Sequence, residues 1–564
     1  MHDATASTLV RRWHGLFTVS RDYWALTAVL AAALLALPIV SVTWIALSST
    51  DSIWPHLVST VLPRALTNTL LLLVGASILA LAIGTGTAWL ITMFRFPGRE
   101  IADRMLVLPL AMPVYIVAYA YVELLDYAGP LQTMLRTNFG ADSFMGTMVP
   151  DVRSLGGAIW LFALVLYPYV YLSARASFVQ QSVCALEVAR TLGRTAGGTF
   201  WSVALPMARP ALAAGVTLVM MECLNDLGAV QYLGVETLSA SIYATWTQRS
   251  NLPGAAQLSL VLLVLVMALL MGERAARGDA AFHHTTGRYR AIPFETLSGG
   301  QAMAALVAVA APVVLGFIVP FAVLALHAVR HLRAYDAMEF LIAARNSLAL
   351  SALASFAAVI MALLFAYAAR LHKSPATRLA ARLSSFGYAL PGTVLAIGLL
   401  APLAAFDNGL DAWMRATFSV STGLLLSGSL FAVTCALVIR FLAVAISNVE
   451  AGLERISPNI DAAAKTLGTR STSALRRIHL PMLKPAIGAA ALLVFVDAMK
   501  ELPATLLLRP FNFDTLATQI YGLTAAEQFE AASVGAVAIV LIGLIPVLLL
   551  HRAVSEGRAG GSGR

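Results

Sequence analysis

Two pairs of carboxylates lie within long apolar stretches of this chain, and they are the side chains best suited to bind a cation. Glu222 and Asp226 belong to MECLNDLG, and Asp497 and Glu501 belong to VDAMKELP at the same offset in the second half. Each pair has the i, i+4 spacing that places two side chains on one face of a helix. If these stretches cross a membrane, such costly carboxylates by default mark an ion or substrate path. The alternative is a structural network in which donors such as Lys500 neutralise them.

The stretches that carry these carboxylates are long enough to cross a bilayer. Of the 564 residues, 59% are hydrophobic and only 12% are charged, which is far from the averages of soluble proteins. Apolar runs of roughly 20 residues, the length that spans the hydrocarbon core, occur about twelve times. The sequence therefore predicts an all-α polytopic membrane protein. The predicted spans are 25–47, 66–92, 104–125, 157–176, 207–231, 255–272, 302–326, 346–369, 386–405, 424–446, 484–508 and 533–551.

The two halves of the chain are copies of one unit. TNTLLLL around Asn68 matches RNSLALS around Asn346, and AMPVY around Pro113 matches ALPGT around Pro391. Because six spans return the chain to its starting side, the copies run in the same orientation, related by a pseudo-twofold axis along the membrane normal. We expect a first unit over 1–272, a cytoplasmic linker over 273–301 and a second unit over 302–564.

The basic residues predict the orientation in the membrane. Most of the 38 lysines and arginines lie in the termini, the linker, the loops after the second span of each half and two polar segments, 187–206 and 462–481. The positive-inside rule places these parts in the cytoplasm. Both termini are then cytoplasmic, and the net charge of +9 is a signal of topology rather than of nucleic-acid binding. The longer loops near 126–156, 232–254, 327–345 and 509–532 face outward.

The two polar segments share one pattern. EVARTLGRTAGGTFWSVALP and AAAKTLGTRSTSALRRIHLP carry Gly193 and Gly468 at the same position, and both end in Leu-Pro, at Pro206 and Pro481. Glycine can adopt the left-handed conformation that ends a helix, and proline suits the first turn of a helix. The pattern predicts a helix, a glycine turn, a short helix and then a membrane helix. The alternative is an ordinary amphipathic loop that happens to repeat.

These segments resemble the cytoplasmic loops of ABC-importer permeases, in which a Glu-Ala-Ala motif, a later Gly and Ile-x-Leu-Pro press a coupling helix into a groove of the ATPase subunit. This chain departs from the motif because Val188 replaces the first Ala, and because Ala462 occupies the Glu position with Asp461 one residue earlier. The resemblance implies ATPase-docking roles for Glu187, Ala189, Gly193, Leu205, Pro206, Asp461, Ala463, Ala464, Gly468, Ile478, Leu480 and Pro481.

Two further segments, KELPATLLLRPFNFDTLATQIY and LGAVQYLGVETLSASIY, look like the fused two-unit permeases of ferric-iron importers. The resemblance covers nearly the whole chain and implies a type I ABC importer-like permease in the bacterial plasma (inner) membrane. Its partners would be two copies of a cytoplasmic ABC ATPase, a periplasmic or extracellular substrate-binding protein and the lipid bilayer, with no nucleic acid. ATP would bind the partner ATPase, so we expect no cofactor and no catalytic residue in this chain.

The substrate stays open at this point. Carboxylate oxygens suit a hard trivalent cation, which agrees with iron but does not establish it, and no metal ligands are firmly assigned. Related fused permeases carry thiamine, phosphonates or polyamines. A secondary transporter driven by an ion gradient is an alternative of another class, but it leaves the twin polar segments unexplained. A membrane-embedded enzyme would need a nucleophile or metal constellation that the sequence lacks.

Three smaller motifs receive ordinary interpretations. LSGGQ (297–301) has the letters of the ABC signature motif, but no lysine in the chain follows a glycine, as a phosphate loop requires. We therefore interpret LSGGQ as a chance match. The adjacent His283 and His284 lack further spaced ligands and indicate a solvated linker rather than a metal site. Gly84 in GTGTA predicts close packing between helices.

Overall fold

The computed structural model describes residues 23–48, 53–140, 151–180, 195–277, 295–332, 336–371, 377, 379–380, 384 and 386–556. Most of these residues are helical. Within the described residues, eleven helices are long and apolar enough to cross a membrane, or twelve if the bent pair Arg99–Ala111 and Val114–Phe139 forms one span. The predicted all-α class with about twelve spans is confirmed. His283 and His284 lie outside the described residues.

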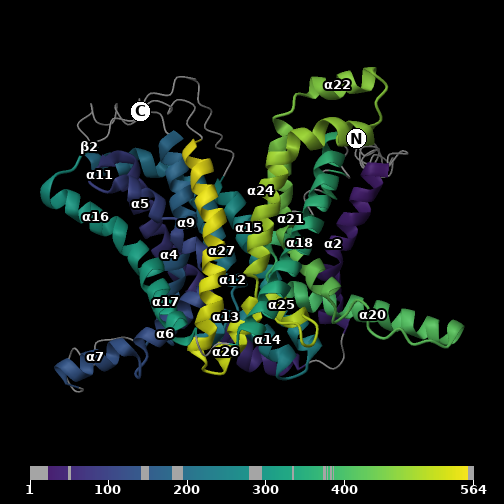
Figure 1. Ribbon diagram of the computed structural model, residues 1–564, viewed down its shortest axis with the longest axis horizontal. Coiled ribbons are helices and arrows are strands. Elements are labelled where there is room, and N and C mark those ends of the chain that lie inside the picture. Colours follow the sequence, from purple (N-terminus) through teal and green to yellow (C-terminus); the bar gives the residue numbers. More distant parts are fainter. Residues whose placement is uncertain are drawn as a thin grey trace, which may run out of the picture. The chain divides into compact units, whose positions relative to one another are not determined.

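Figure 1 shows the helices in chain order by colour. The long helices are α2 (Tyr23–Ser48), α4 (Leu62–Met93), α9 (Leu155–Gln180), α12 (Leu205–Asn225), α15 (Leu252–Arg277), α16 (Gly299–Val313), α17 (Val319–His331), α18 (Ala337–Leu371), α20 (Gly392–Phe418), α21 (Leu430–Glu454), α24 (Leu480–Met499) and α27 (Phe529–Glu556). The short helices are α3 (Trp54–His56), α5 (Arg99–Met105), η2 (Leu108–Ala111), α6 (Val114–Leu125), α7 (Pro130–Phe139), α11 (Ala196–Thr199), α13 (Gly228–Tyr232), α14 (Leu238–Thr247), η5 (Phe386–Ala389), α22 (Pro458–Thr466), α23 (Ser471–Ala474), α25 (Pro503–Leu508) and α26 (Leu516–Ala525).

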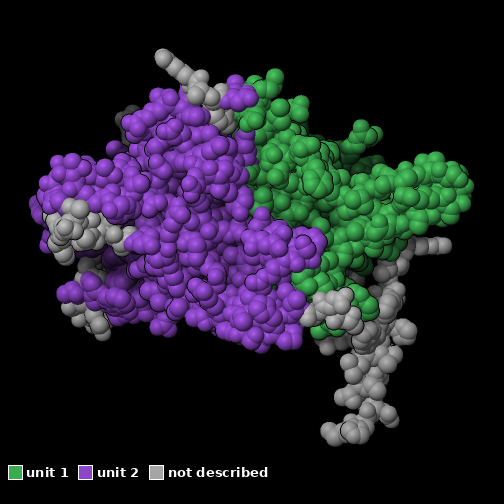
Figure 2. Space-filling model, turned by 90° about the horizontal axis from the view of Figure 1, so that it is seen from below, with its two compact units in different colours: residues 1–52, 251–260, 338–518 green, residues 53–250, 261–337, 519–564 purple. Residues whose placement is uncertain are grey.

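The chain forms two compact units, shown in different colours in Figure 2. Unit 1 contains residues 1–52, 251–260 and 338–518, and unit 2 contains residues 53–250, 261–337 and 519–564. Each unit therefore combines segments from both halves of the sequence. The predicted division into 1–272, 273–301 and 302–564 follows the sequence repeat, and the compact units do not follow it.

Close helix contacts hold the exchanged segments in their units. In unit 1, α2 from the first half packs against α20 from the second half, and a Cβ at Gly398 would come within 2.4 Å of Pro38 O. In unit 2, a Cβ at Gly316, in the turn between α16 and α17, would come within 2.4 Å of Leu164 O in α9. The chain can bring these backbones together only because both positions lack a side chain.

The same polar contacts recur in the two halves. In unit 2, Asn68 Nδ2 donates to the backbone oxygen of Glu236 at 3.1 Å, and in unit 1, Asn346 Nδ2 donates to that of Asp514 at 3.0 Å. In both cases the hydroxyl of the residue after the asparagine, Thr69 or Ser347, also accepts a hydrogen bond. Its donor is the backbone N–H two residues after the carbonyl that the asparagine contacts. These matching bonds show that the repeat read from the sequence is also a structural repeat.

Four π-helical turns precede prolines and keep the surrounding helices continuous. They are η1 (Leu57–Val61), η3 (Phe200–Ala204), η4 (Val314–Ile318) and η6 (Leu475–His479), and the second residue after each is a proline. A proline cannot donate to the carbonyl four residues earlier and clashes with it. In each case that carbonyl lies within the π turn, whose wider spacing makes room. Pro206 and Pro481 were expected to begin separate helices, but they lie in the continuous helices Gly197–Asn225 and Ser471–Met499.

Other predicted spans also differ from the observed helices. The predicted span 104–125 is interrupted at Pro113, whose ψ of 144° is extended, and the chain bends by 94° between the two sides. The predicted spans 207–231 and 484–508 end early, at Asn225 and Met499. Both early ends lie next to the candidate carboxylates.

Glycine and a short strand pair position two parts of unit 2. A Cβ at Gly84 would lie 2.8 Å from Tyr167 O and from Tyr171 N, so this glycine lets α4 approach α9, as predicted.

The end of the linker pairs with the residues that follow α4. They form two parallel strands, β1 (Phe94–Arg95) and β2 (Glu295–Thr296). LSGGQ follows directly, and its first glycine, Gly299, begins α16 with a φ of +56°.

Candidate docking and carboxylate sites

The two polar segments, 187–206 and 462–481, are the candidate docking segments and are called the first and second docking segments below. The second has the predicted helix, glycine turn and short helix. The helix α22 ends before Gly468, whose φ is +69°. Thr469 N donates to Ala464 O at 2.9 Å, the six-to-one bond of a Schellman motif, in which the glycine supplies the left-handed residue. A short helix formed by α23 and η6 then leads into α24. The prediction that Gly468 forms a left-handed turn is confirmed.

Polar contacts attach α22 to the end of α18. The side chain of Arg370 donates from Nε to Asp461 Oδ2 at 2.8 Å. The same guanidinium donates to the backbone oxygens of Leu453 and Ile456, so it bridges the end of α21 to α22. On the other side of the carboxylate, Nε2 of the buried His479 lies 2.8 Å from Asp461 Oδ1. Asp461 thus holds the docking segment to its own unit.

The outer face of α22 is apolar at its end. Ala463 and Gly468 are exposed, while Ala464 is buried. Leu467 is 82% exposed, which is unusual for a large apolar side chain next to a helix end. In the membrane-helix part of the segment, Ile478 and Leu480 are half-buried and Pro481 is exposed. Leu467 was not among the predicted docking residues, although TLG occurs at the same place in both copies and could have indicated it.

Only the later part of the first docking segment is described. Glu187, Ala189 and Gly193 lie outside the described residues. From Ala196 onward, α11 and η3 repeat the order of α23 and η6, and Leu205 and Pro206 are half-buried at the start of α12. Trp201, within η3, is 70% exposed. The matching part of the second copy instead exposes the basic pair Arg476 and Arg477.

Glu501 is a buried helix cap and ion-pair partner. Its side chain is fully buried, and Oε1 accepts hydrogen bonds from Arg440 Nη1 at 2.9 Å and from Ala504 N at 2.8 Å. Oε2 accepts from Thr505 N at 3.0 Å and from Thr505 Oγ1 at 2.8 Å. A Cβ at Gly392 would lie 2.7 Å from Arg440 Nη1 and 2.8 Å from Glu501 Oε1, so a glycine is needed beside this pair. These contacts match the structural network weighed as the alternative to a substrate path.

The predicted placement of each carboxylate pair on one helix face is wrong. α12 ends at Asn225 and α24 ends at Met499, so Asp226 and Glu501 lie beyond the helices that carry their partners. Asp226 has an extended backbone, and its Oδ1 accepts from Ala229 N at 2.7 Å at the start of α13. Each of these two carboxylates stabilises the first turn of the following short helix, where backbone N–H groups lack helical partners.

The first carboxylate of each pair is in the helix. Glu222 lies in α12 and is half-buried. Asp497, in α24, forms an ion pair with Lys500 Nζ at 2.9 Å, and both side chains are about one third exposed (29% and 31%). Among the described residues, no group of three or more His, Cys, Asp or Glu side chains is arranged to hold a metal ion. Within this part of the chain, these carboxylates do not form a preformed metal cage.

The membrane-spanning helices and the duplicated polar segments are those of a membrane permease, and comparison with known proteins gives its family. Residues 78–272 and 356–558 match the binding-protein-dependent transport system inner membrane component. The chain belongs to this family. It is the multi-pass permease of an ABC importer, with two family repeats in one polypeptide.

Among its relatives, the Fe(3+)-transport system permease protein FbpB 2 of Haemophilus influenzae is 29% identical over 491 residues, which cover 86% of this chain and 89% of that protein. The molybdenum transport system permease protein ModB of Escherichia coli is 26% identical over 209 residues, covering 36% of this chain and 88% of ModB. The putative 2-aminoethylphosphonate transport system permease protein PhnU of Salmonella choleraesuis is 28% identical over 215 residues, covering 38% of this chain and 74% of PhnU.

Proposed function

We propose that this permease imports ferric iron. The observation that carries the proposal is the extent of the match to the Fe(3+)-transport permease, which covers most of both chains, including both repeats. The molybdenum and 2-aminoethylphosphonate permeases match only 36% and 38% of this chain. The fused arrangement therefore accompanies iron among these relatives.

We further propose that two copies of a separate ATPase bind the two docking segments, and that ATP binds only to those partners. Because the ATPase is cytoplasmic, this proposal places both docking segments and both termini in the cytoplasm. The distribution of basic residues agrees with that orientation. The exposed Leu467 and Ala463 suit an apolar groove on the partner. Because Arg370 ties Asp461 to the end of α18, a displacement of α22 by the partner would be transmitted to a membrane helix.

A binding protein on the opposite side of the membrane would deliver the cation. The two carboxylate pairs were predicted to mark an ion or substrate path, and that path stays a prediction. Glu222 and Asp497 are half-buried, whereas the side chain of Glu501 is fully buried, so Glu501 is less suited than either of them to contact a cation. Carboxylate oxygens are suitable first contacts for a hard trivalent ion, which could exchange between them and water.

Uptake by a reconstituted complex tests this proposal. The chain is purified with a candidate ATPase and a candidate binding protein and is placed in vesicles with ATP on the docking-segment side. We expect ATP-dependent uptake of labelled Fe(III), and no uptake of labelled molybdate or 2-aminoethylphosphonate. Uptake of either of these compounds without iron would refute the iron assignment while leaving the importer class intact. Uptake driven by an ion gradient without the ATPase would refute the docking proposal.

A further inference from the structure

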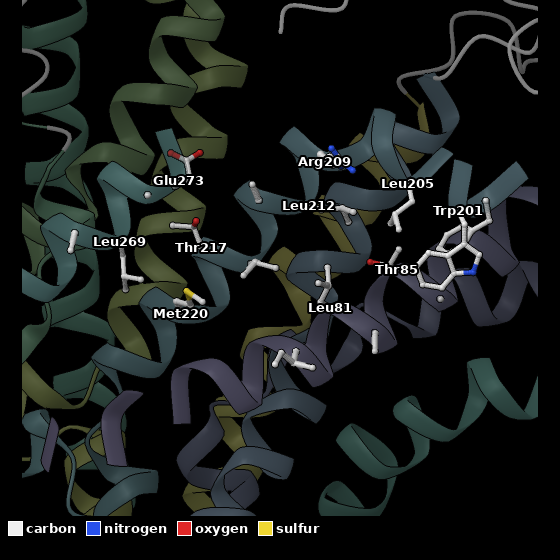
Figure 3. A pocket seen from close by; sticks show the side chains of 18 residues that line it. Leu81, Thr85, Trp201, Leu205, Arg209, Leu212, Thr217, Met220, Leu269 and Glu273 are labelled. Atoms are coloured by element: carbon white, nitrogen blue, oxygen red, sulfur yellow. The ribbon is translucent and has the colours of Figure 1, made fainter. Parts of the chain in front are cut away.

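Two apolar features of the molecule have no role in the sites described above. One is a cavity of about 890 Å³ in unit 2, between α4, α12, α15 and η3 (Figure 3). Its lining is largely apolar and does not select one ligand. The other is a hairpin in unit 1, residues 404–429, which consists of the second half of α20 and the segment that returns to α21. We call it the α20 hairpin, and its polar groups form a defined pattern.

The α20 hairpin exposes large apolar side chains on both of its arms. On α20, Phe406 and Trp413 are seven residues apart and therefore lie on one face of the helix. On the returning arm, Leu424 and Leu425 are exposed as well. These four side chains are between 50% and 65% exposed. The small residues of the same helix face are also exposed, and they are Ala405, Gly409, Ala412 and Ala416. An exposed apolar surface of this kind marks contact with another protein or with a membrane.

The acidic side chains of the hairpin bind its own backbone. Asp407 is buried, and its carboxylate accepts hydrogen bonds from Leu426 N at 3.0 Å and from Ser427 N at 2.7 Å. Asp411 accepts from Thr422 N at 2.8 Å. The returning arm has no helix or strand of its own, so these two carboxylates supply partners for backbone groups that would otherwise need water. In lipid, such groups must be satisfied within the protein.

The charges of the hairpin are also paired within it. Its charged residues are Asp407, Asp411 and Arg415. Arg415 Nε forms an ion pair with Asp411 Oδ2 at 2.6 Å, and Arg415 Nη2 donates to Ser421 Oγ at 2.9 Å. A surface that binds a soluble protein usually has a polar rim around its apolar centre. The α20 hairpin instead has its polar bonds between its two arms and its large apolar side chains outside.

The two sides of α20 within the hairpin differ in polarity. Asn408 follows Phe406 by two residues, and two residues turn a helix by about 200°. Arg415 follows Trp413 by the same distance. The polar pair therefore lies on the side of the helix opposite the apolar pair. An amphipathic helix of this kind lies in the membrane–water interface, with its apolar face at the acyl chains.

The first half of α20 brings the hairpin to the lipid-facing surface of unit 1. It crosses α2 where Gly398 meets Pro38. Beyond this crossing, the spanning helix α2 exposes Trp44 and Leu47. Figure 1 shows the second half of α20 extending sideways from α18 and α21, at the end of unit 1 away from α22. The hairpin therefore begins beside a helix that exposes apolar side chains to lipid, in the half of the membrane away from the second docking segment.

The other repeat has a surface helix at the equivalent place. Pro113 and Pro391 are equivalent, and the same offset relates α7 to residues 408–417 of the hairpin. In unit 2, α7 exposes Met134 and Phe139. Its one charged residue, Arg136, donates to the backbone oxygen of Tyr127. Exposed apolar side chains and an internally bonded charge thus occur at this place in both repeats.

We propose that the α20 hairpin lies in the membrane–water interface on the side opposite the second docking segment. Phe406, Trp413 and Leu424 enter the lipid, and Asn408 faces water. Tryptophan is enriched at this level of membrane proteins because its ring is apolar and its N–H is polar. The bilayer then holds α20 in place. The first residue of α20, Gly392, lies against the pair of Arg440 and Glu501, so the hairpin supports the helix that covers this buried ion pair.

Nitroxide labels on single cysteines test this proposal. Trp413→Cys and Leu424→Cys place labels on the apolar side, and Asn408→Cys is the matched control on the polar side of the same helix. The full-length protein is used, with its own three cysteines replaced by serine, and each variant is placed in phosphatidylcholine vesicles after its thermal stability has been checked. We expect the first two labels to collide severalfold more often with oxygen, which concentrates in lipid, than with a water-soluble nickel complex. The label of Asn408→Cys should show the reverse preference.

Two outcomes of this experiment would overturn the proposal. Equal access of the nickel complex to all three labels would show that the hairpin lies in water, as a docking surface for a soluble binding protein would. Magnetic coupling between Trp413→Cys labels on separate molecules would show that a second copy of the chain covers this face.

A measurement without labels or cysteine replacement gives an independent check. Phospholipids with brominated acyl chains quench tryptophan fluorescence on contact, and part of the quenching in the wild type should be lost in Trp413→Phe, which keeps an aromatic ring. If the two proteins show the same quenched intensity, Trp413 does not contact lipid and the proposal fails.

Discussion

Replacing Glu501 with glutamine tests whether this carboxylate is a structural group or part of a substrate path. Glu501 is fully buried beside Arg440, whose side chain is only 10% exposed. Glu501→Gln keeps the shape of the side chain but leaves the charge of Arg440 without a partner. Removing one partner of a buried ion pair costs about 3–5 kcal/mol. Whichever way the amide is turned, its NH₂ also faces a backbone donor, Ala504 N or Thr505 N. We therefore expect the free energy of unfolding to fall by an amount near the upper end of that range.

The matched control is Asp497→Asn, which changes a carboxylate in the last turn of α24, four residues before Glu501. Its ion pair with Lys500 is partly exposed, and such pairs contribute less than about 1 kcal/mol. Thermal unfolding of the purified full-length variants should show a large loss of stability for Glu501→Gln and a small one for Asp497→Asn. A double-mutant cycle with Arg440→Met adds a second measurement, because removing both charges should cost less than the sum of the single changes.

Iron uptake per folded molecule completes this test. If Glu501 is a helix cap and ion-pair partner, the folded fraction of Glu501→Gln transports normally once expression is accounted for. A variant with wild-type stability and much reduced uptake would refute this reasoning and place Glu501 in the substrate path.

Three further outcomes follow from single side chains. Gly468→Val forces a β-branched residue into a left-handed turn, which costs about 1–2 kcal/mol; this cost is in the backbone alone, because a Cβ there would meet nothing within 4 Å. Co-purification with the ATPase should weaken while membrane insertion is unchanged. Unchanged co-purification would contradict a coupling role. Gly84→Ala should lower thermal stability because its Cβ would lie 2.8 Å from backbone atoms of α9. The control Gly86→Ala should be neutral or slightly stabilising, because a Cβ there would meet nothing within 4 Å. Equal effects of the two variants would show that α4 and α9 do not pack this closely. Ser298→Ala, in LSGGQ, should leave ATP-dependent uptake near wild type because that side chain makes no capping hydrogen bond; a large loss of ATP turnover would reveal a nucleotide site.

The sequence by itself predicted the features that depend on short stretches of chain. Apolar length alone sets which segments can cross a bilayer, and about twelve spans were expected from it. The repeat was visible in the matched surroundings of Asn68 and Asn346, and the same two hydrogen bonds now appear in both units. The left-handed turn at Gly468 was predictable because only glycine adopts that conformation without strain.

The ends of α12 and α24 could have been predicted but were not. The i, i+4 spacing of the carboxylates favoured a continuous helix, and hydrophobicity did not distinguish a long span from a span followed by a short helix. Pro503, two residues after Glu501, was the local signal, because proline prefers the first turn of a helix and the residue before it disfavours helix. An acidic residue just before such a proline is typical of a helix start.

Only the tertiary structure decided which distant residues meet. The exchange of α2 into unit 1, the ion pair of Arg440 with Glu501, and the attachment of Asp461 to Arg370 all join segments that are far apart in the chain. Hydropathy and spacing describe each helix alone, and they are the same whichever helix it packs against.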